Sequence, residues 1–493
     1  MSAPTLADHL RKATRHGSTR LPVEQVLALG RDLARELGRA HAETPPRHPS
    51  LDPAAIAYGE AGPRLDTGPA EGSVPEDLFL LGALLHGLLG QEPHVSWRLD
   101  GPPPAEVDGF RRRNVLAMLA SPSRLAGFAS AAEAAEALEA ALAAEAAESP
   151  WSLFRGGTAR AGVAAGGAPA PASLGPGWLA RVGAVTASPV LTADMVVAVT
   201  ADGRLLFLDR ATGRRVHEIG LDAPVESSPA IAGGVLAVGT DSGELVLVDL
   251  ARGEVRHRAR LGSLVRSSPL IVEDRVVVGV VEGKAGGALV AVDTQSGKVV
   301  WTRRAGAVFS SPALWEERVL VGSDDGTLYA VEAATGAPAW SVPLGGKVRA
   351  TPAIAEGVAV VGDFGGRLTA VRVDDGATAW TAAVGHAMYS SPCRLARGWV
   401  VGCHEGHLHG WQDSGAPAFE VPTHGPVISS AATLGDAFAV GSTDGALYLV
   451  AASGDVRQRL VLAKGGVASS PAVDADVVYV GSAEGVHALR AGR

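Results

Sequence analysis

The chain has 493 residues, of which 47% are hydrophobic and 19% are charged, and its formal net charge is −9. This length exceeds one ordinary core, so we expect at least two domains, and the composition excludes wholesale disorder. The charge is spread along the chain without a basic block, which gives no support for binding to nucleic acid or to anionic membranes.

The first residues, MSAPTLADHLRKATRHG, contain no apolar segment of the kind that a secretory signal needs. No apolar run in the chain approaches the roughly 18–20 residues of a transmembrane helix. We therefore expect a cytoplasmic, bacterial-type protein that does not insert into membranes. The two cysteines, Cys393 and Cys403, have no partners at zinc-site spacing, so we expect reduced structural thiols.

Residues 1–147 are expected to be α-helical. The segment 21–42 places five apolar residues on one helical stripe: Val23, Val26, Leu27, Leu33 and Leu37. The segment 75–90 is apolar nearly all round, as a buried helix would be. A third helix is expected after Ser130, which stands at capping-box spacing from Glu133.

The segment RHPSLDPAAIAYG (47–59) resembles a protein-kinase catalytic loop at His48, Leu51 and Pro53. The helix before it is similar to the one that precedes this loop in bacterial Ser/Thr kinases. Further landmarks of a kinase C-lobe are resembled, in the right order, by LDTG at 65–68, by the segment 74–94 with Asp77, and by the segment 121–142. The alternative is an unrelated alanine-rich helical bundle.

The resemblance does not extend to the residues that catalyse phosphoryl transfer, which needs a base, Mg²⁺ ligands and a phosphate-binding lysine. Ser50 stands at the base position, and Asp52 and Ala55 replace the loop lysine and the Mg²⁺-binding asparagine. Asp66 alone could still hold a metal ion. No glycine-rich loop and no N-lobe lysine precede residue 21. We therefore expect a degenerate, inactive module that binds no nucleotide.

Residues 148–175 are rich in glycine, alanine and proline, which predicts a flexible linker. Beyond it a V-x-S-S-P frame recurs eight times, with its proline, or alanine once, at 189, 229, 269, 312, 352, 392, 431 and 471. Each repeat holds four strand-like runs joined by Asp- and Gly-containing turns, which is typical of a β-propeller blade. The sequence therefore predicts a mainly β protein, with an eight-bladed propeller of four-stranded antiparallel blades over residues 176–493.

The last repeat stops after its third strand, so its fourth strand has to come from elsewhere. Trp178 lies 11 residues before Pro189, just as Trp301 lies 11 residues before Pro312. We expect residues 177–183 to complete the eighth blade, which joins the two ends of the array and removes an open edge.

The segment ALVAVDTQSGKVVW (288–301) resembles the pyrroloquinoline-quinone-type (PQQ-like) repeat, A-x-D-x-x-T-G-x-x-x-W, and the segments 330–340 and 370–380 are similar to it. In that family the tryptophans pack between blades. The resemblance therefore implies a blade-docking role for Trp178, Trp301, Trp340 and Trp380. It places His217, His257, Phe419 and Arg459 at the same position in the other blades.

The quinoprotein dehydrogenases of that family hold their quinone with a vicinal Cys-Cys pair, a tryptophan floor, a calcium site and a catalytic Asp. This chain has no Cys-Cys dipeptide and no recognisable cluster of acidic calcium ligands, so we expect no quinone and no other cofactor. The other branch of the family comprises non-catalytic propellers, such as the outer-membrane assembly lipoprotein that scaffolds a β-barrel insertion machine. Resemblance to that branch implies a binding role.

The second position of the V-x-S-S-P frame varies although the rest is nearly fixed: it reads Thr186, Glu226, Arg266, Phe309, Arg349, Tyr389, Ile428 and Ala468. The first strand of each blade lines the central channel and starts at one mouth, so these residues form a ring there. Arginine and aromatic residues are favoured interface anchors. We expect a protein partner to contact Glu226, Arg266, Phe309, Arg349 and Tyr389. The alternative is that they are ordinary rim residues.

Four histidines, His386, His404, His407 and His409, lie close together in the sequence. His407 and His409 alternate along one expected strand and so could share a face. Because a metal site needs a third or fourth convergent ligand, we expect a solvated or packed set of histidines and no metal.

These observations predict a protein that is not an enzyme and has no catalytic residues. It would act as a scaffold or sensor that binds an unidentified protein partner through its propeller. Two alternatives remain. One is an oxidoreductase that depends on PQQ or acts on a sugar, and the other is a regulatory pseudokinase that still binds a nucleotide.

Overall fold

The computed structural model describes residues 23–42, 57–59, 62–65, 81, 151–164, 171–250 and 252–492. The chain divides into two compact units. One comprises residues 1–148 and 250–252, and the other comprises residues 149–249 and 253–493. Among the described residues no helix is long and apolar enough to cross a membrane.

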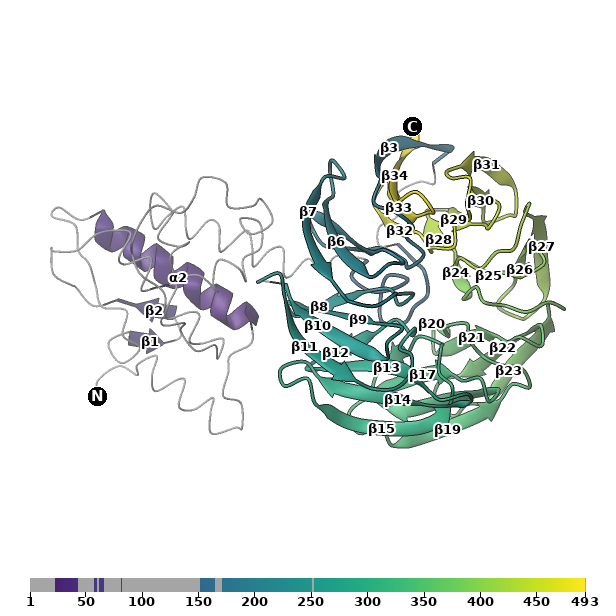
Figure 1. The fold of residues 1–493 in the computed structure, drawn as a ribbon, viewed down its shortest axis with the longest axis horizontal. Helices are drawn as coiled ribbons and strands as arrows, with labels where there is room; N and C mark the ends of the chain where they lie inside the picture. Colours follow the sequence, from purple (N-terminus) through teal and green to yellow (C-terminus); the bar gives the residue numbers. More distant parts are fainter. Residues whose placement is uncertain are drawn as a thin grey trace. The chain divides into compact units, whose positions relative to one another are not determined.

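The first unit contains helix α2 (Val23–His41) and a short antiparallel hairpin of β1 (Ala57–Gly59) and β2 (Gly62–Arg64) (Figure 1). The helix expected over residues 21–42 is therefore confirmed, and Leu33 and Leu37 on its apolar stripe are buried. The hairpin was not predicted. The other expected helices and the catalytic-loop, LDTG and closing segments of the kinase resemblance lie almost wholly outside the described residues, so the kinase-like module stays a prediction.

The second unit is a ring of eight four-stranded antiparallel blades, as the repeat predicted (Figure 1). Blade 1 comprises β4 (Val190–Leu191), β5 (Met195–Val199), β6 (Arg204–Asp209) and β7 (Arg215–Gly220). Blade 2 comprises β8 (Ala230–Ala232), β9 (Val235–Gly239), β10 (Glu244–Asp249) and β11 (Glu254–Arg260). Blade 3 comprises β12 (Leu270–Val272), β13 (Arg275–Glu282), β14 (Gly286–Asp293) and β15 (Val299–Gly306). Blade 4 comprises β16 (Ala313–Trp315), β17 (Arg318–Gly322), β18 (Thr327–Glu332) and β19 (Pro338–Pro343).

The remaining blades repeat this order. Blade 5 comprises β20 (Ala353–Ala355), β21 (Val358–Gly362), β22 (Arg367–Arg372) and β23 (Thr378–Ala383). Blade 6 comprises β24 (Cys393–Leu395), β25 (Gly398–Gly402), β26 (His407–Trp411) and β27 (Pro417–Pro422). Blade 7 comprises β28 (Ala432–Leu434), β29 (Ala437–Gly441), β30 (Ala446–Ala451) and β31 (Val456–Val461). Blade 8 comprises β32 (Ala472–Asp474), β33 (Val477–Gly481), β34 (Val486–Gly492) and, from the other end of the array, β3 (Ser173–Ala180).

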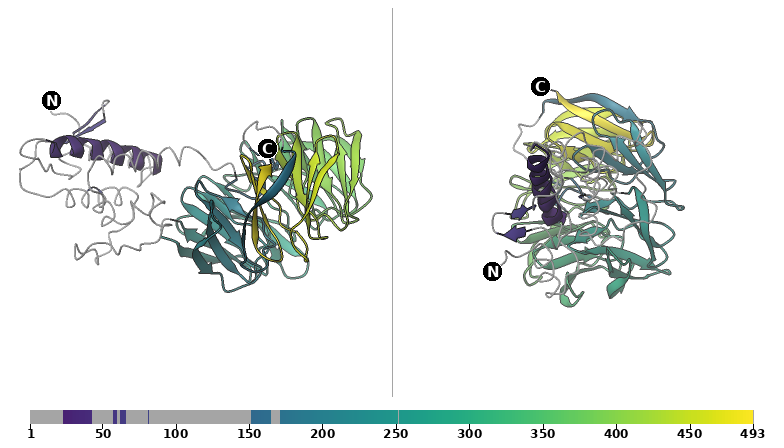
Figure 2. Two further views of the ribbon diagram at one scale, coloured as in Figure 1. Left: turned by 90° about the horizontal axis from the view of Figure 1, so that it is seen from above. Right: turned by 90° about the vertical axis from the view of Figure 1, so that its left-hand side faces the viewer.

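Strand β3 closes the ring. It pairs antiparallel with β34, and Figure 2 shows the blue β3 beside the yellow β34. The expected closure is confirmed, although the strand spans Ser173–Ala180 and so begins before the expected segment 177–183.

The hydrophobic core lies between neighbouring blades. The second and third strands are buried along almost their whole length, whereas the fourth strand alternates between exposed and partly buried residues, as in β7 and β31. The inner strands are covered by a blade on each face and therefore read as continuous apolar runs, whereas the fourth strand faces solvent. One cluster joins Val196 of blade 1, Leu447 of blade 7 and Val478 of blade 8.

Residues 151–164 differ from the flexible linker that their composition predicted. Trp151, Leu153, Arg155 and Arg160 are all buried, and the segment forms hydrogen bonds with the first strands of several blades. Figure 1 shows it in blue inside the ring of blades. The glycines and alanines that suggested flexibility instead let a chain fit in a narrow space. We call residues 151–164 the channel plug.

Candidate functional site

A closed ring of hydrogen bonds around the channel explains the V-x-S-S-P frame. The donor is the second serine or threonine of the frame. In every blade its backbone N–H donates to the side-chain hydroxyl at the same frame position of the next blade, at donor–acceptor distances from 2.9 to 3.3 Å. The hydroxyls belong to Ser188, Ser228, Ser268, Ser311, Thr351, Ser391, Ser430 and Ser470. The frame is therefore conserved between repeats for bonding as well as for small size. The ring fixes the backbone from which the variable mouth residues project.

Arg266 is held by carboxylates from two neighbouring segments. Its Nε and Nη2 donate to the two carboxylate oxygens of Asp241 at 2.9 and 2.7 Å, and its Nη1 lies 3.0 Å from Glu226 Oε2. The hydrogen bonds with Asp241 raise the pKa of Arg266 against the opposing effect of its partial burial. Two predicted site residues, Glu226 and Arg266, thus lie together, with their charges already paired.

Arg349 repeats this arrangement two blades further on. Its Nε and Nη2 donate to Asp324 at 2.9 and 2.7 Å, and Lys347 Nζ lies 3.4 Å from the same carboxylate. The guanidinium also lies over two aromatic rings, with its central carbon 4.1 Å from the Phe309 centroid and 5.3 Å from the Phe364 centroid. Such stacking adds to the ion pair because the ring face is electron-rich.

Tyr389 extends this stack. The centroids of Phe364 and Tyr389 are 4.5 Å apart, and those of Tyr389 and His404 are 6.0 Å apart. Tyr389 is 42% exposed, whereas Phe309, Phe364 and Arg349 are partly buried. The structure therefore brings the five predicted residues to the same mouth, in two adjoining groups. We call Glu226, Arg266, Phe309, Arg349, Phe364 and Tyr389 the mouth patch.

The sequence reasoning missed Asp241, Asp324 and Phe364 and considered His404 only as a member of the histidine set. Each stands 12 residues after the frame's proline, in the turn between the second and third strands. Asp241, Asp324 and Phe364 contact the variable residue of the next blade, whereas His404 lies near Tyr389 of its own blade. Blades 1 and 8 carry the small residues Ala201 and Ala483 there, and blades 3 and 7 carry Val281 and Thr443. This second variable position at a fixed offset is the signal that could have found them.

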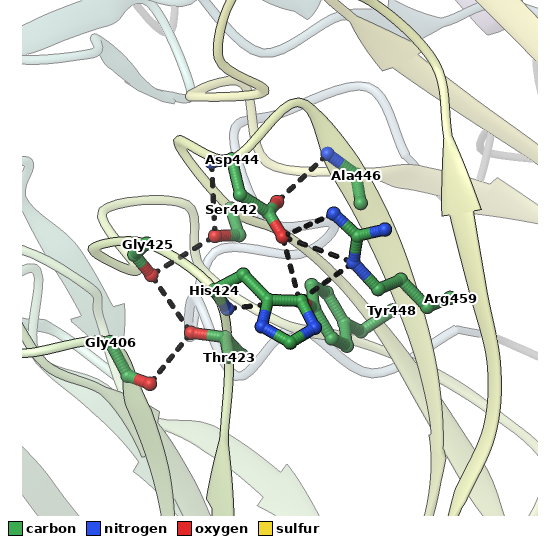
Figure 3. Close-up of polar contacts among 9 residues, drawn as sticks. All are labelled: Gly406, Thr423, His424, Gly425, Ser442, Asp444, Ala446, Tyr448 and Arg459. Atoms are coloured by element: carbon green, nitrogen blue, oxygen red, sulfur yellow. Dashed lines mark hydrogen bonds and ion pairs between the residues drawn. The ribbon is translucent and has the colours of Figure 1, made fainter.

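A polar network on blade 7 joins Asp444, Tyr448 and Arg459 (Figure 3). The Tyr448 hydroxyl donates to Asp444 at 2.7 Å, and Arg459 Nη2 donates to the same oxygen at 2.9 Å. Burial raises the pKa of Tyr448, and its hydrogen bond with Asp444 raises it further. Burial also raises the pKa of Asp444, but the hydrogen bonds that it accepts outweigh this effect and lower it overall.

The same Asp–Tyr pair occurs in blade 4, where the Tyr329 hydroxyl donates to Asp325 at 2.8 Å. In both blades the aspartate also accepts a backbone N–H of its own turn, from Ala446 or from Thr327. Because the pair recurs at equivalent positions and braces a turn, we interpret it as structural.

Two of the four histidines, His407 and His409, lie on strand β26. The rings of His407 and His409 are 6.0 Å apart, and Cys403 Sγ lies 3.7 Å from His409 Nε2. His386 Nδ1 lies 3.7 Å from Glu405 Oε1, and His407 Nε2 lies 3.7 Å from Glu420 Oε1. Among the described residues, no group of three or more His, Cys, Asp or Glu side chains is arranged to hold a metal ion.

The four tryptophans lie on the fourth strands, and at least three of them contact the next blade through a hydrogen bond. The indole N–H groups of Trp178, Trp301 and Trp340 donate to carbonyls of the next blade at 3.0, 3.1 and 2.7 Å. Trp380 lies against Gly415 of the next blade. His217 and His257 form the equivalent contacts with Gly253 and Gln295.

In blade 7 this docking position is held by Gln458, and the assignment of Arg459 to it is wrong. The bulge that precedes the tryptophan position in other blades falls here between Leu449 and Val450, so Gln458 pairs with Leu449 as Trp340 pairs with Ala330. Gln458 exchanges two hydrogen bonds with the Leu174 backbone, at 2.6 and 3.0 Å. It therefore docks on β3, the strand that closes the ring.

A family model described as "Beta-alanine-activating enzyme, beta-propeller" matches residues 184–486, which is more than half of the chain. The chain belongs to this family. No curated protein matches the sequence.

Solved structures share the fold at low identity. BamB from Moraxella catarrhalis is 22% identical, with a TM-score of 0.58, and the match covers 65% of this chain and 100% of that one. Quinohemoprotein alcohol dehydrogenase from Comamonas testosteroni is 14% identical, with a TM-score of 0.61, over 71% of this chain and 82% of that one. A europium-containing methanol dehydrogenase is 13% identical, with a TM-score of 0.58, over 69% and 91%. These similarities show the propeller fold.

The family match corrects one expectation. We expected a chain that is not an enzyme, because the residues of kinases and of quinoproteins are missing, but its family is named for the propeller of an activating enzyme. Enzymes with the same propeller fold are also among the similar structures. The reasoning failed because the loss of residues from two enzyme classes says nothing about membership of a third.

Proposed function

We propose that the propeller is a protein-binding module of this activating-enzyme family and that the mouth patch is its contact surface. The observation that supports this best is the continuous stack of Phe309, Arg349, Phe364 and Tyr389 at one mouth of the channel. Arginine and aromatic side chains carry a large share of binding energy in protein interfaces.

The ion pairs make the patch suitable for contact with an uncharged part of a partner. Asp241 and Asp324 already neutralise Arg266 and Arg349, so neither cation requires a carboxylate from outside. The two-point ion pairs fix the side-chain rotamers of both arginines, and the stacking adds to this for Arg349. Less conformational entropy is therefore lost when a partner binds. Tyr389, the most exposed aromatic of the patch, can then be covered by an apolar or aromatic side chain.

The mouth is unequal around its circumference, which gives a partner a defined orientation. Blades 2 to 6 supply the charged and aromatic residues, whereas blades 7, 8 and 1 place Ile428, Ala468 and Thr186 at the same position. Large side chains therefore project from one arc of the ring and small ones from the other.

Affinity capture from cells that express the protein tests this proposal. The wild type is compared with the full-length double variant Arg266→Glu plus Tyr389→Ala. The matched control is Arg215→Glu plus Val299→Ala, which changes an exposed arginine and an exposed apolar residue on fourth strands. We expect a partner to be retained by the wild type and the control and lost by the mouth variant.

Equal capture by all three proteins would contradict the assignment of the site to the mouth patch. Capture of no partner by the wild type would contradict the binding role itself.

A further inference from the structure

The channel plug forms backbone hydrogen bonds with six of the eight first strands. In each case a first-strand N–H donates to a plug carbonyl, at 2.8 to 2.9 Å. The donors are Leu191, Ile231, Leu314, Ile354, Arg394 and Thr433, and the acceptors are Trp151, Ser152, Thr158, Ala159, Ala161 and Gly162. All six donors stand two residues after the proline position of the frame. The inner edges of the blades therefore act as one repeated set of donors.

Two arginines of the plug use a second repeated set, the carbonyls of the frame prolines. Arg160 donates from Nε to Pro312 O at 3.1 Å and from Nη2 to Pro269 O at 2.6 Å, and Arg155 Nη2 donates to Pro392 O. Both guanidinium groups are fully buried. A guanidinium suits this role because it presents several N–H donors in one plane, which a lysine does not.

The plug and the mouth patch lie at different levels of the channel. Along each first strand the chain passes the variable mouth residue, then the serine ring, then the proline, and then the residue that contacts the plug. The plug is therefore separated from the mouth patch by the closed ring of serine hydrogen bonds.

Several features show that the plug is held under strain. Arg155 and Arg160 have φ angles of 63° and 54°, in the left-handed region that non-glycine residues seldom occupy. Among the described residues, Arg155 Nε and Nη1 have no hydrogen-bond partner. Burial lowers the pKa of Arg155 to about 10 and that of Arg160 to about 9, well below the usual range of an arginine. Placing the plug in the channel therefore removes the two guanidinium groups from water, and withdrawal of the plug would restore their solvation free energy.

We propose that the inner edges of the first strands form a peptide-binding ring, and that the channel plug is its ligand bound in cis. The partner that fits this ring is a glycine-containing peptide that folds into the same turns as the plug and carries two arginines five residues apart. Such a peptide from another protein would bind when the plug is withdrawn. Unpaired strand edges are a common surface for adding a peptide through its backbone. This proposal does not rest on the function proposed for the mouth patch.

The test uses the full-length chain and a fluorescent peptide with the sequence of residues 151–164. In the variant Arg155→Ala plus Arg160→Ala the plug loses its proline-carbonyl contacts, and we expect the peptide to bind at least about tenfold more tightly than to the wild type. A second peptide, in which both arginines are alanine, should bind neither protein. The variant Arg215→Ala plus Arg304→Ala, which changes two exposed arginines, should behave like the wild type.

A variant that unfolds cooperatively but binds no peptide, or binds both peptides equally, would overturn the proposal and leave the plug as a fixed part of the fold. If the variant does not fold, it is refolded with each peptide present. Recovery of folded protein with the arginine peptide alone would support the proposal, and recovery with neither or with both would overturn it.

Discussion

The guanidinium carbon of Arg349 lies 4.1 Å from the centre of the Phe309 ring. The same side chain forms a two-point ion pair with Asp324, so its plane is fixed from two directions. Both contacts depend on a flat, forked cation.

The first prediction concerns this geometry. Arg349→Lys keeps the charge but loses the fork and most of the stacking, so we expect partner binding to weaken by about tenfold, or about 1.4 kcal/mol. The control is Lys347→Arg, which changes the neighbouring cation and should leave binding within about twofold of the wild type. Titration of the captured partner by calorimetry measures both. Equal affinity of Arg349→Lys and the wild type would show that only charge matters here.

A second prediction tests the serine ring. Ser311→Ala leaves the buried backbone N–H of Ser268 without its acceptor, which should lower the free energy of unfolding by about 1–3 kcal/mol. Ser311→Thr keeps the hydroxyl, as Thr351 does naturally in the next blade, and should cost less than about 1 kcal/mol. Urea unfolding of the two variants gives the difference. Similar losses of unfolding free energy in both variants would mean that packing, and not the hydrogen bond, determines which residue occupies this frame position.

Blade docking gives a third prediction. Gly336 has a φ angle of 68°, and a Cβ there would lie 2.6 Å from the Trp301 ring. We expect Trp301→Ala to lower the free energy of unfolding by about 3–5 kcal/mol, and Gly336→Ala to lower it by about 1–3 kcal/mol. Because both changes break one contact, the double variant should lose less than their sum. Strict additivity in thermal or urea unfolding would contradict the proposed docking contact.

The fourth prediction is a loss of stability at acidic pH. Burial lowers the pKa of His487 below its usual 6.5, and repulsion from Arg181 adds to this against the attraction of Glu484. The unfolded chain therefore takes up the proton first, and stability falls as the pH drops through 6.5 toward the lower pKa of the folded state. His409 shifts in the same direction.

Melting temperatures at about pH 7.5 and about pH 5.5 measure this effect. His487→Gln keeps a group that can bond Ser482, whose hydroxyl lies 2.8 Å from the His487 Nε2, and it should show a smaller drop than the wild type. An equal drop in both proteins would assign the acid sensitivity to other groups.

The repeat made the propeller predictable, because V-x-S-S-P recurs at an almost constant spacing and each recurrence marks a first strand. The mouth ring followed from the same register, which is why Arg266, Phe309 and Arg349 could be placed together before any contact was known. Their partners Asp241, Asp324 and Phe364 were missed because they lie in the turns between second and third strands, outside the repeated frame.

Two errors have physical causes. The plug was mistaken for a linker because glycine and alanine are favoured both by flexible chains and by chains confined in a narrow channel, and composition does not separate the two. Arg459 was placed at the docking position by counting back from the proline, but blade 7 has one more residue between that position and the next frame, so the docking residue is Gln458.

Hydrogen–deuterium exchange of the full-length protein, with and without its captured partner, tests the central claim most directly. The account predicts slower exchange, on adding the partner, in the backbone segments that carry Arg266, Phe309, Arg349, Phe364 and Tyr389, with fourth strands such as β7 and β31 unchanged. Slower exchange confined to the fourth strands, or no change at the mouth segments, would contradict it.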